Sequence, residues 1–114
     1  MRAIALAIAA ALLPGAAWAH HGWSSYDAAK TVKITAPIDK LEWGNPHSMI
    51  WLKQDGVQKE IYLAPISRMM TRGLEPDALK AGKSVTIEAY ASTANNNEMR
   101  AERITVDGKT FELR

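Results

Sequence analysis

The predicted fold is decided by the stretch Thr31-Val32-Lys33-Ile34-Thr35-Ala36-Pro37-Ile38-Asp39-Lys40-Leu41-Glu42-Trp43. Its first part alternates between apolar residues such as Ile34 and polar residues such as Lys33, which is typical of a strand with one buried face. After Asp39 the phase shifts, because Leu41 and Trp43 are now the apolar positions. One inserted residue produces such a shift and also sharpens the bend of a strand. We therefore expect a long, bulged and curved first strand, as a small closed barrel requires.

Turn signals divide the rest of the chain into further strands and one short helix. Asp55-Gly56 suits a type I′ hairpin turn, and Asp107-Gly108 turns the chain again. Pro65 is suited to open a helix and Gly73 to end it in a left-handed conformation. The remaining strands are expected over residues 49–52, 58–64, 84–91 and 99–106, with a short terminal strand over 110–113. Within the helix, Ile66, Met69 and Met70 have the spacing of one apolar face.

This order predicts an all-β domain with one short helix, built as a small five-stranded OB-like barrel with the helix between strands three and four. A flattened sandwich is the alternative, but it leaves the helix unexplained. In OB barrels, ligands usually meet the face of strands two and three and the loops between strands one and two and between four and five. Here those loops contain His47 and residues 95–97.

The first residues read as an export signal rather than as part of the domain. Arg2 gives a positive start, residues 4–13 are apolar, and Ala17-Trp18-Ala19 is a small-x-small cleavage pattern. The apolar run is too short to span a membrane, so we expect no membrane anchor. The predicted organisation is a signal peptide over 1–19, an irregular arm over 20–30 and the barrel domain over 31–114. The mature protein is expected to be periplasmic or secreted.

Composition narrows the classes of function. The chain has 14 basic and 12 acidic residues. So balanced a charge argues against nucleic acid as a partner, because capture of nucleic acid needs a concentrated basic face. The chain has no cysteine, which excludes a disulfide scaffold and thiolate metal sites.

Several short motifs lie along the chain at positions that suit loops, turns and strand starts. They are His20-His21-Gly22-Trp23, Tyr26-Asp27, Trp43-Gly44-Asn45-Pro46-His47, the segment from Arg68 to Gly73, Leu79-Lys80-Ala81-Gly82 and Val85-Thr86-Ile87. Together they resemble a family of short exported bacterial proteins catalogued as a domain of unknown function. The resemblance covers the mature chain and implies a periplasmic single domain without an established activity. Ala81 departs from the proline that the family pattern has there, which affects the rigidity of that turn.

Export would create the most specific chemical feature. Cleavage after Ala19 makes His20 the first residue, whose amine and imidazole Nδ1 can chelate one metal ion. An imidazole from His47, or from His21 in its place, completes a three-nitrogen set of the kind that suits Cu(II). The amine loses its proton readily near neutral pH. The arrangement resembles the histidine brace of secreted copper proteins. The alternative is that His20 and His21 are exposed to solvent and bind no metal, and that His47 forms hydrogen bonds within its own loop.

Aromatic residues around the same loop offer a second kind of site. Trp43 and Trp51 flank the loop and, with Asn45 and Tyr26, are candidate ligand-binding residues on an aromatic platform for a sugar or small ring compound. The alternative is that tryptophans in so small a domain are core anchors.

No catalytic motif is present, since the chain has neither a nucleophile elbow nor a glycine-rich phosphate loop. We therefore expect a periplasmic non-enzymatic binding protein that takes copper through His20 and His47. The alternative is an envelope interaction module that binds a peptide, small molecule or protein partner on its aromatic face without metal. A copper-dependent oxidase is the enzymatic alternative.

Overall fold

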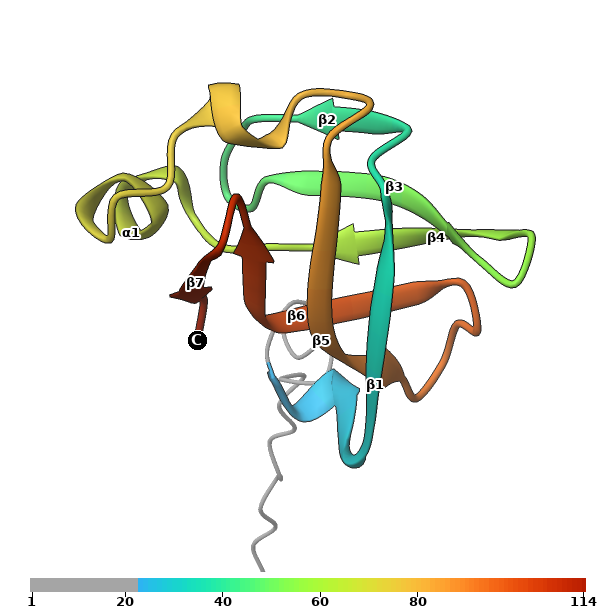
Figure 1. Ribbon diagram of the computed structural model, residues 1–114. Helices are drawn as coiled ribbons and strands as arrows, with labels where there is room; N and C mark the ends of the chain where they lie inside the picture. The colour runs from blue at the N-terminus through green and yellow to red at the C-terminus, as the bar shows by residue number, and fades with distance from the viewer. Residues whose placement is uncertain (1–22) are drawn as a thin grey trace, which may run out of the picture.

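The computed structural model describes residues 23–114, and Figure 1 shows their arrangement. The predicted signal peptide over 1–19, His20 and His21 lie outside these described residues. The strands are β1 (Tyr26–Pro37), β2 (Lys40–Glu42), β3 (Met49–Gln54), β4 (Val57–Tyr62), β5 (Ser84–Ser92), β6 (Glu98–Val106) and β7 (Lys109–Glu112). The α-helix α1 (Ile66–Thr71) follows β4. Two short 3-10 helices, η2 (Trp23–Ser25) and η3 (Pro76–Leu79), precede β1 and β5. The fold is therefore mostly β with one short α-helix, as the sequence predicted.

The prediction of a closed five-stranded barrel is not confirmed. Seven strands form one open mixed sheet in the order β1-β5-β6-β4-β3-β2, with β7 paired to β6. The predicted first strand is divided at Ile38 and Asp39, and its two parts lie at opposite ends of this order because β1 pairs with β5 and β2 with β3. The pairing of β4 with β6 is parallel, whereas the other pairings are antiparallel.

The sheet bends so strongly that its two parts face each other across the core. Figure 1 shows β1 and β5 running steeply across β3 and β4. A register shift between Glu88 and Ala89 interrupts the pairing of β5 with β6, as a bulge does where a sheet turns. Alternating residues of the facing strands fill the space between them, and those without solvent exposure include Ile50, Leu52, Ile61, Ile87 and Ile104.

The turn and helix predictions are largely confirmed. Asp55 and Gly56 have φ of 52° and 82°, the two positive values that a type I′ turn needs. Gly73 follows α1 with φ of 89°. The helix buries Met69 completely, but Met70 is 46% exposed, so the predicted apolar face is wrong at that position. A helix of six residues is too short to bury more than one stripe.

The start of the domain also differs from the prediction. β1 begins at Tyr26, within the segment expected to be an irregular arm, and Tyr26 and Asp27 pair with Ser92 and Ala91. The register then shifts before Thr31, and Asp27 Oδ1 accepts a hydrogen bond of 2.9 Å from the Ala29 amide. This irregularity breaks the alternation of apolar residues, so the sequence pattern does not mark the strand. Within residues 23–114 no helix has the length and apolarity to cross a membrane.

Candidate functional site

The loop between β2 and β3 is held in place by Ser48. This residue has no solvent exposure, and its hydroxyl both accepts a hydrogen bond from the Gly44 amide (3.1 Å) and donates one to the Gly44 carbonyl (3.2 Å). The Ser48 backbone amide donates to Ala64 O (3.2 Å), and its carbonyl accepts from Leu63 N (2.8 Å). Ser48 therefore ties the loop to itself and to the end of β4, and His47 is presented next to this fixed point.

Ser48 is a residue that the sequence analysis missed. Its only signal is a hydroxyl side chain four residues after a glycine in a loop, a position from which it can bond the backbone. Asn45, a predicted ligand-binding residue, has a hydrogen-bond partner within the fold. Its side-chain oxygen accepts a hydrogen bond of 3.4 Å from the amide of Ile66, the first residue of α1. The Asn45–Pro46 peptide bond is cis.

His47 lies against Tyr62 on the outer face of the sheet. The two ring centroids are 6.3 Å apart and the rings meet edge to face, at 84°. Tyr62 is paired with Met49 of β3 on one side and with Arg100 of β6 on the other. Partial burial is the main cause that raises the pKa of Tyr62, and the carboxylates of Glu98, Glu60 and Glu42 raise it further. The phenol is therefore protonated and neutral at physiological pH.

The next residue along this face, Arg100, is almost completely buried beneath Trp23. Only 5% of Arg100 is exposed, and its guanidinium carbon lies 4.3 Å from the centroid of the Trp23 ring. The guanidinium carbon of Arg114 lies 4.7 Å from the same ring, and Tyr90 meets Trp23 edge to face with centroids 5.5 Å apart. Burial lowers the pKa of Arg100, and the charges of Arg68 and Arg114 add to this effect. The first described residue of the chain is therefore clamped onto β6.

Tyr26, also a predicted ligand-binding residue, is buried and bonded. Its hydroxyl donates a hydrogen bond of 2.5 Å to the carboxylate of Glu98, a contact between residues 72 positions apart. Burial raises the pKa of Tyr26, and the Glu98 carboxylate raises it further. The polar end of Tyr26 is thus engaged in holding β1 to β6.

The two candidate tryptophans have different surroundings. Trp43 is half-buried and packs against the hydrophobic core. Trp51 pairs with Lys40 and Glu60, whose side chains are not part of the core, and the Lys40 ammonium lies 4.8 Å from the Trp51 ring centroid. Trp43 therefore contacts the core while it stays partly exposed, Trp51 lies on the outer face, and an aromatic platform stays a prediction.

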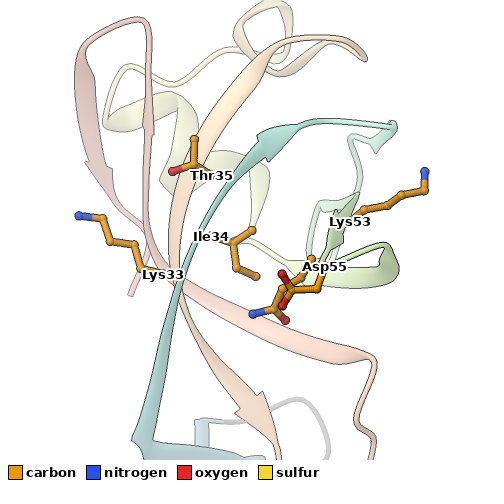
Figure 2. Close-up of a pocket in the computed structure, with 6 residues that line it drawn as sticks. Lys33, Ile34, Thr35, Lys53 and Asp55 are labelled. Carbon is orange, nitrogen blue, oxygen red and sulfur yellow. The ribbon is translucent and has the colours of Figure 1, made fainter.

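A polar hollow lies elsewhere on the molecule, between β1 and the turn from β3 to β4 (Figure 2). It has a volume of about 270 Å³ and is lined by Lys33, Ile34, Thr35, Lys53, Gln54 and Asp55. Figure 2 shows the Lys33 and Lys53 side chains extending away from each other. Lys53 forms an ion pair of 3.0 Å with Asp39. The hollow contains none of the predicted site residues.

The contacts described above join five residues into one surface. We call His47, Tyr62, Glu98, Arg100 and Trp23 the Tyr62 surface. It connects the loop that carries His47 with the beginning of the described chain. Among residues 23–114, no group of three or more histidine, aspartate or glutamate side chains is placed to hold a metal ion. Of the predicted copper ligands, His47 lies within this part of the chain, and His20 and His21 lie outside it.

Comparison with known proteins gives a fold likeness and a family. No curated protein matches the sequence. Among solved structures the chain is similar to one of "a putative aspartyl-tRNA synthetase from Leishmania major Friedlin", with 14% sequence identity and a TM-score of 0.50. The match covers 78% of this chain and 19% of that chain, so it spans a small part of that protein. A likeness at this identity concerns the fold alone.

The family resemblance seen in the motifs is confirmed by a match over residues 7–101. The matched segment includes the loop that carries His47 and all of the Tyr62 surface. The protein therefore belongs to the family described as a family of unknown function (DUF6152).

Proposed function

We propose that the protein is an exported, non-enzymatic binding protein that holds a copper ion at the edge of the Tyr62 surface. His20, as the first residue after cleavage, supplies its amine and its imidazole, and His47 supplies a second imidazole. His21 is the substitute for His47. When bound, the copper ion supplies a Lewis-acidic centre that prefers nitrogen ligands.

One observation carries this proposal, namely that His47 and Trp23 reach the same surface. His47 contacts Tyr62, Tyr62 is paired with Arg100, and Arg100 stacks on Trp23. His20 precedes Trp23 by three residues, which span at most about 11 Å of extended chain. The contacts of Trp23 support the proposal because they attach the described chain to the surface that carries His47.

We further propose that the sheet is an opened variant of the OB-type barrel. The support is the order of pairing, in which β3 and β4 form a hairpin and β4 pairs in parallel with β6. The outer face of β3 and β4 and the loop before β3 correspond to the regions where OB barrels usually bind ligands. Met49, Trp51, Glu60 and Tyr62 are on that face, next to His47.

The test is a Cu(II) titration of protein whose first residue is His20, as verified by mass spectrometry, with electron spin resonance to count bound nitrogens. We expect one tightly bound equivalent with a three-nitrogen signal. His47→Ala should lose one nitrogen and most of the affinity. A variant with one glycine added before His20 keeps every imidazole but moves the amine, so it should lose the chelate. Weak binding that neither change affects would contradict the proposal.

A second candidate function is supported by the outer face itself. Met49, Trp51 and Tyr62 are neighbours on β3 and β4, and the carboxylates of Glu42 and Glu60 act on Tyr62. Such a mixed aromatic and acidic face suits a peptide or protein partner of the cell envelope. If this is the function, Trp51→Ala abolishes copper-independent capture of envelope proteins while His47→Ala leaves it intact. The reverse pattern would remove this candidate.

A further inference from the structure

We infer that the outer face of β2, β3 and β4 binds a basic segment of a partner protein, one in which lysine or arginine residues flank an apolar side chain. This inference rests on the second candidate function given above and names the chemistry of its partner. Such binding requires neither copper nor the N-terminal amine, because every residue that takes part lies between Lys40 and Tyr62.

The strand register places the side chains of this face in two rows. The first row is Glu42, Met49 and Tyr62, and the second row is Lys40, Trp51 and Glu60. Figure 1 shows β2, β3 and β4 side by side, in the order of their pairing. The residues between the two rows on β3 and β4, Ile50 and Ile61, have no solvent exposure, and successive side chains of a strand point to opposite faces. Both rows therefore point away from the core.

The middle of this face is apolar. Met49, Trp51 and Tyr62 are each partly exposed. Met49 is directly opposite Tyr62 and two residues before Trp51, and side chains at such positions are within reach of one another across a strand pair. Aromatic side chains at the centre of an interface supply much of its binding energy. The three residues therefore offer an apolar strip for one side chain of a partner.

Two carboxylates border the apolar strip. Among residues 23–114, neither Glu42 nor Glu60 forms an ion pair with a lysine or arginine. Both carboxylates raise the pKa of Tyr62, so their charges act at the centre of the face. Such carboxylates attract cations and repel phosphate groups. The face therefore favours a basic protein segment over nucleic acid or an anionic lipid surface.

Lys40 shows where a cation lies on this face. Its ammonium is 4.8 Å from the Trp51 ring centroid, and Glu60 is the cross-strand neighbour of Trp51 on the other side. A cation over an indole ring is attractive, and an arginine guanidinium adds a planar fork that fits a carboxylate. Lys40 is itself exposed on the three-residue strand β2, so its ammonium can leave the ring. A guanidinium of the partner therefore replaces the Lys40 ammonium on Trp51 and pairs with Glu60.

The spacing of the two carboxylates selects an extended segment over a small cation. Glu42 and Glu60 lie two strands and two residues apart, roughly 12 Å between backbones, because neighbouring strands are about 4.8 Å apart and each residue rises about 3.3 Å. One small cation cannot contact both carboxylates. In an extended peptide, residues four positions apart point to the same side and are separated by about 13 Å. Two basic residues at this spacing reach both carboxylates, and the residue midway between them faces the apolar strip.

The experiment measures the affinity of the metal-free protein for synthetic peptides by isothermal titration calorimetry, with a chelator present. The basic peptide has two arginines four positions apart, a leucine midway between them and serines elsewhere. The control peptide has glutamates in place of the arginines. The basic peptide should bind roughly tenfold more tightly than the control peptide, and its affinity should fall as salt is added, because salt screens exposed charge pairs.

Matched variants test whether the peptide binds on the outer face. Glu60→Gln and Glu42→Gln should each weaken binding of the basic peptide about twofold to fivefold, the range of an exposed ion pair. Glu75→Gln removes an exposed carboxylate outside the two rows and should change nothing. Lys40→Ala should strengthen binding about twofold to fivefold, because the indole ring is then open to the peptide. Lys109→Ala makes the same change of charge at the exposed start of β7 and should leave the affinity unchanged.

Several results would overturn the inference. One is an affinity for the basic peptide that neither Glu42→Gln nor Glu60→Gln changes. Another is that Lys109→Ala strengthens binding as much as Lys40→Ala, since the attraction would then come from net charge alone. Equal affinities for the two peptides that Trp51→Ala abolishes overturn the inference but leave the second candidate function standing. Binding of neither peptide overturns the inference, and if Trp51→Ala also leaves capture of envelope proteins intact, the second candidate function fails with it.

Discussion

Replacing Ser48 with alanine should destabilise the protein by about 2 kcal/mol. The substitution removes two hydrogen bonds, one to the Gly44 amide at 3.1 Å and one to its carbonyl at 3.2 Å. Each such bond contributes about 1 kcal/mol net, and a buried group left without its partner costs at least as much. The backbone bonds of Ser48 to Leu63 and Ala64 persist, so the loop stays attached to β4 but loses its internal closure. Two kcal/mol is a large part of the stability of a small domain.

Urea and thermal unfolding followed by circular dichroism measure this change. The midpoint temperature should fall by roughly 8–16 °C, and the slope of the urea transition should stay constant because the exposed surface hardly changes. Ser84→Ala is the matched control, since Ser84 is an exposed residue on β5 and its replacement should change stability by less than about 0.5 kcal/mol. A Ser48→Ala protein as stable as the Ser84→Ala protein would refute the role given to the Ser48 hydroxyl.

Three further changes test other parts of the structure. Burial and Glu98 hold the pKa of Tyr26 above its ordinary value of 10.0, so the stability that this group contributes is complete below that pH and declines above it. Tyr26→Phe should therefore be less stable than the parent at pH 8 but show a shallower loss between pH 9 and 11, as measured by urea unfolding. Arg72→Lys should cost about 0.5–1.5 kcal/mol and speed amide exchange in the last residues, because the Arg72 guanidinium donates to the Glu112 carbonyl at 2.6 Å. Met69→Ala should cost about 2–5 kcal/mol through a cavity in the core, a loss that thermal unfolding would register.

The parts of the fold that the sequence predicted are those with local causes. Asp55-Gly56 makes its turn because both residues adopt positive φ, and Gly73 ends α1 for the same reason. Pro65 precedes the helix, as a residue without an amide proton suits that position. Each of these features depends on a few neighbouring residues, so it can be identified without knowing the rest of the molecule.

The parts that the sequence did not predict depend on distant partners. Tyr26 interrupts a polar segment of the sequence, and its pairing with Ser92 and its bond to Glu98, 72 positions away, explain why a strand begins there. The division of the first strand at Ile38 follows from its neighbours too, because Ile38 exchanges backbone hydrogen bonds with Lys83 and Gly82 of the segment before β5. For the site, His47 stood out as a histidine in a rigid loop, whereas nothing in the local pattern connects Trp23 with Arg100.

The contact between Arg114 and Trp23 means that the two ends of the described chain meet. A short flexible linker can therefore join Arg114 to Trp23, and new termini can be opened at the exposed Asp55-Gly56 turn. Such a circular permutant keeps the sheet, the loop with His47 and the contact of Arg100 with Trp23, but it lacks the N-terminal amine that the proposed copper site requires. Its unfolding midpoint would report the stability of the fold, and its copper affinity would report the contribution of the N-terminal amine.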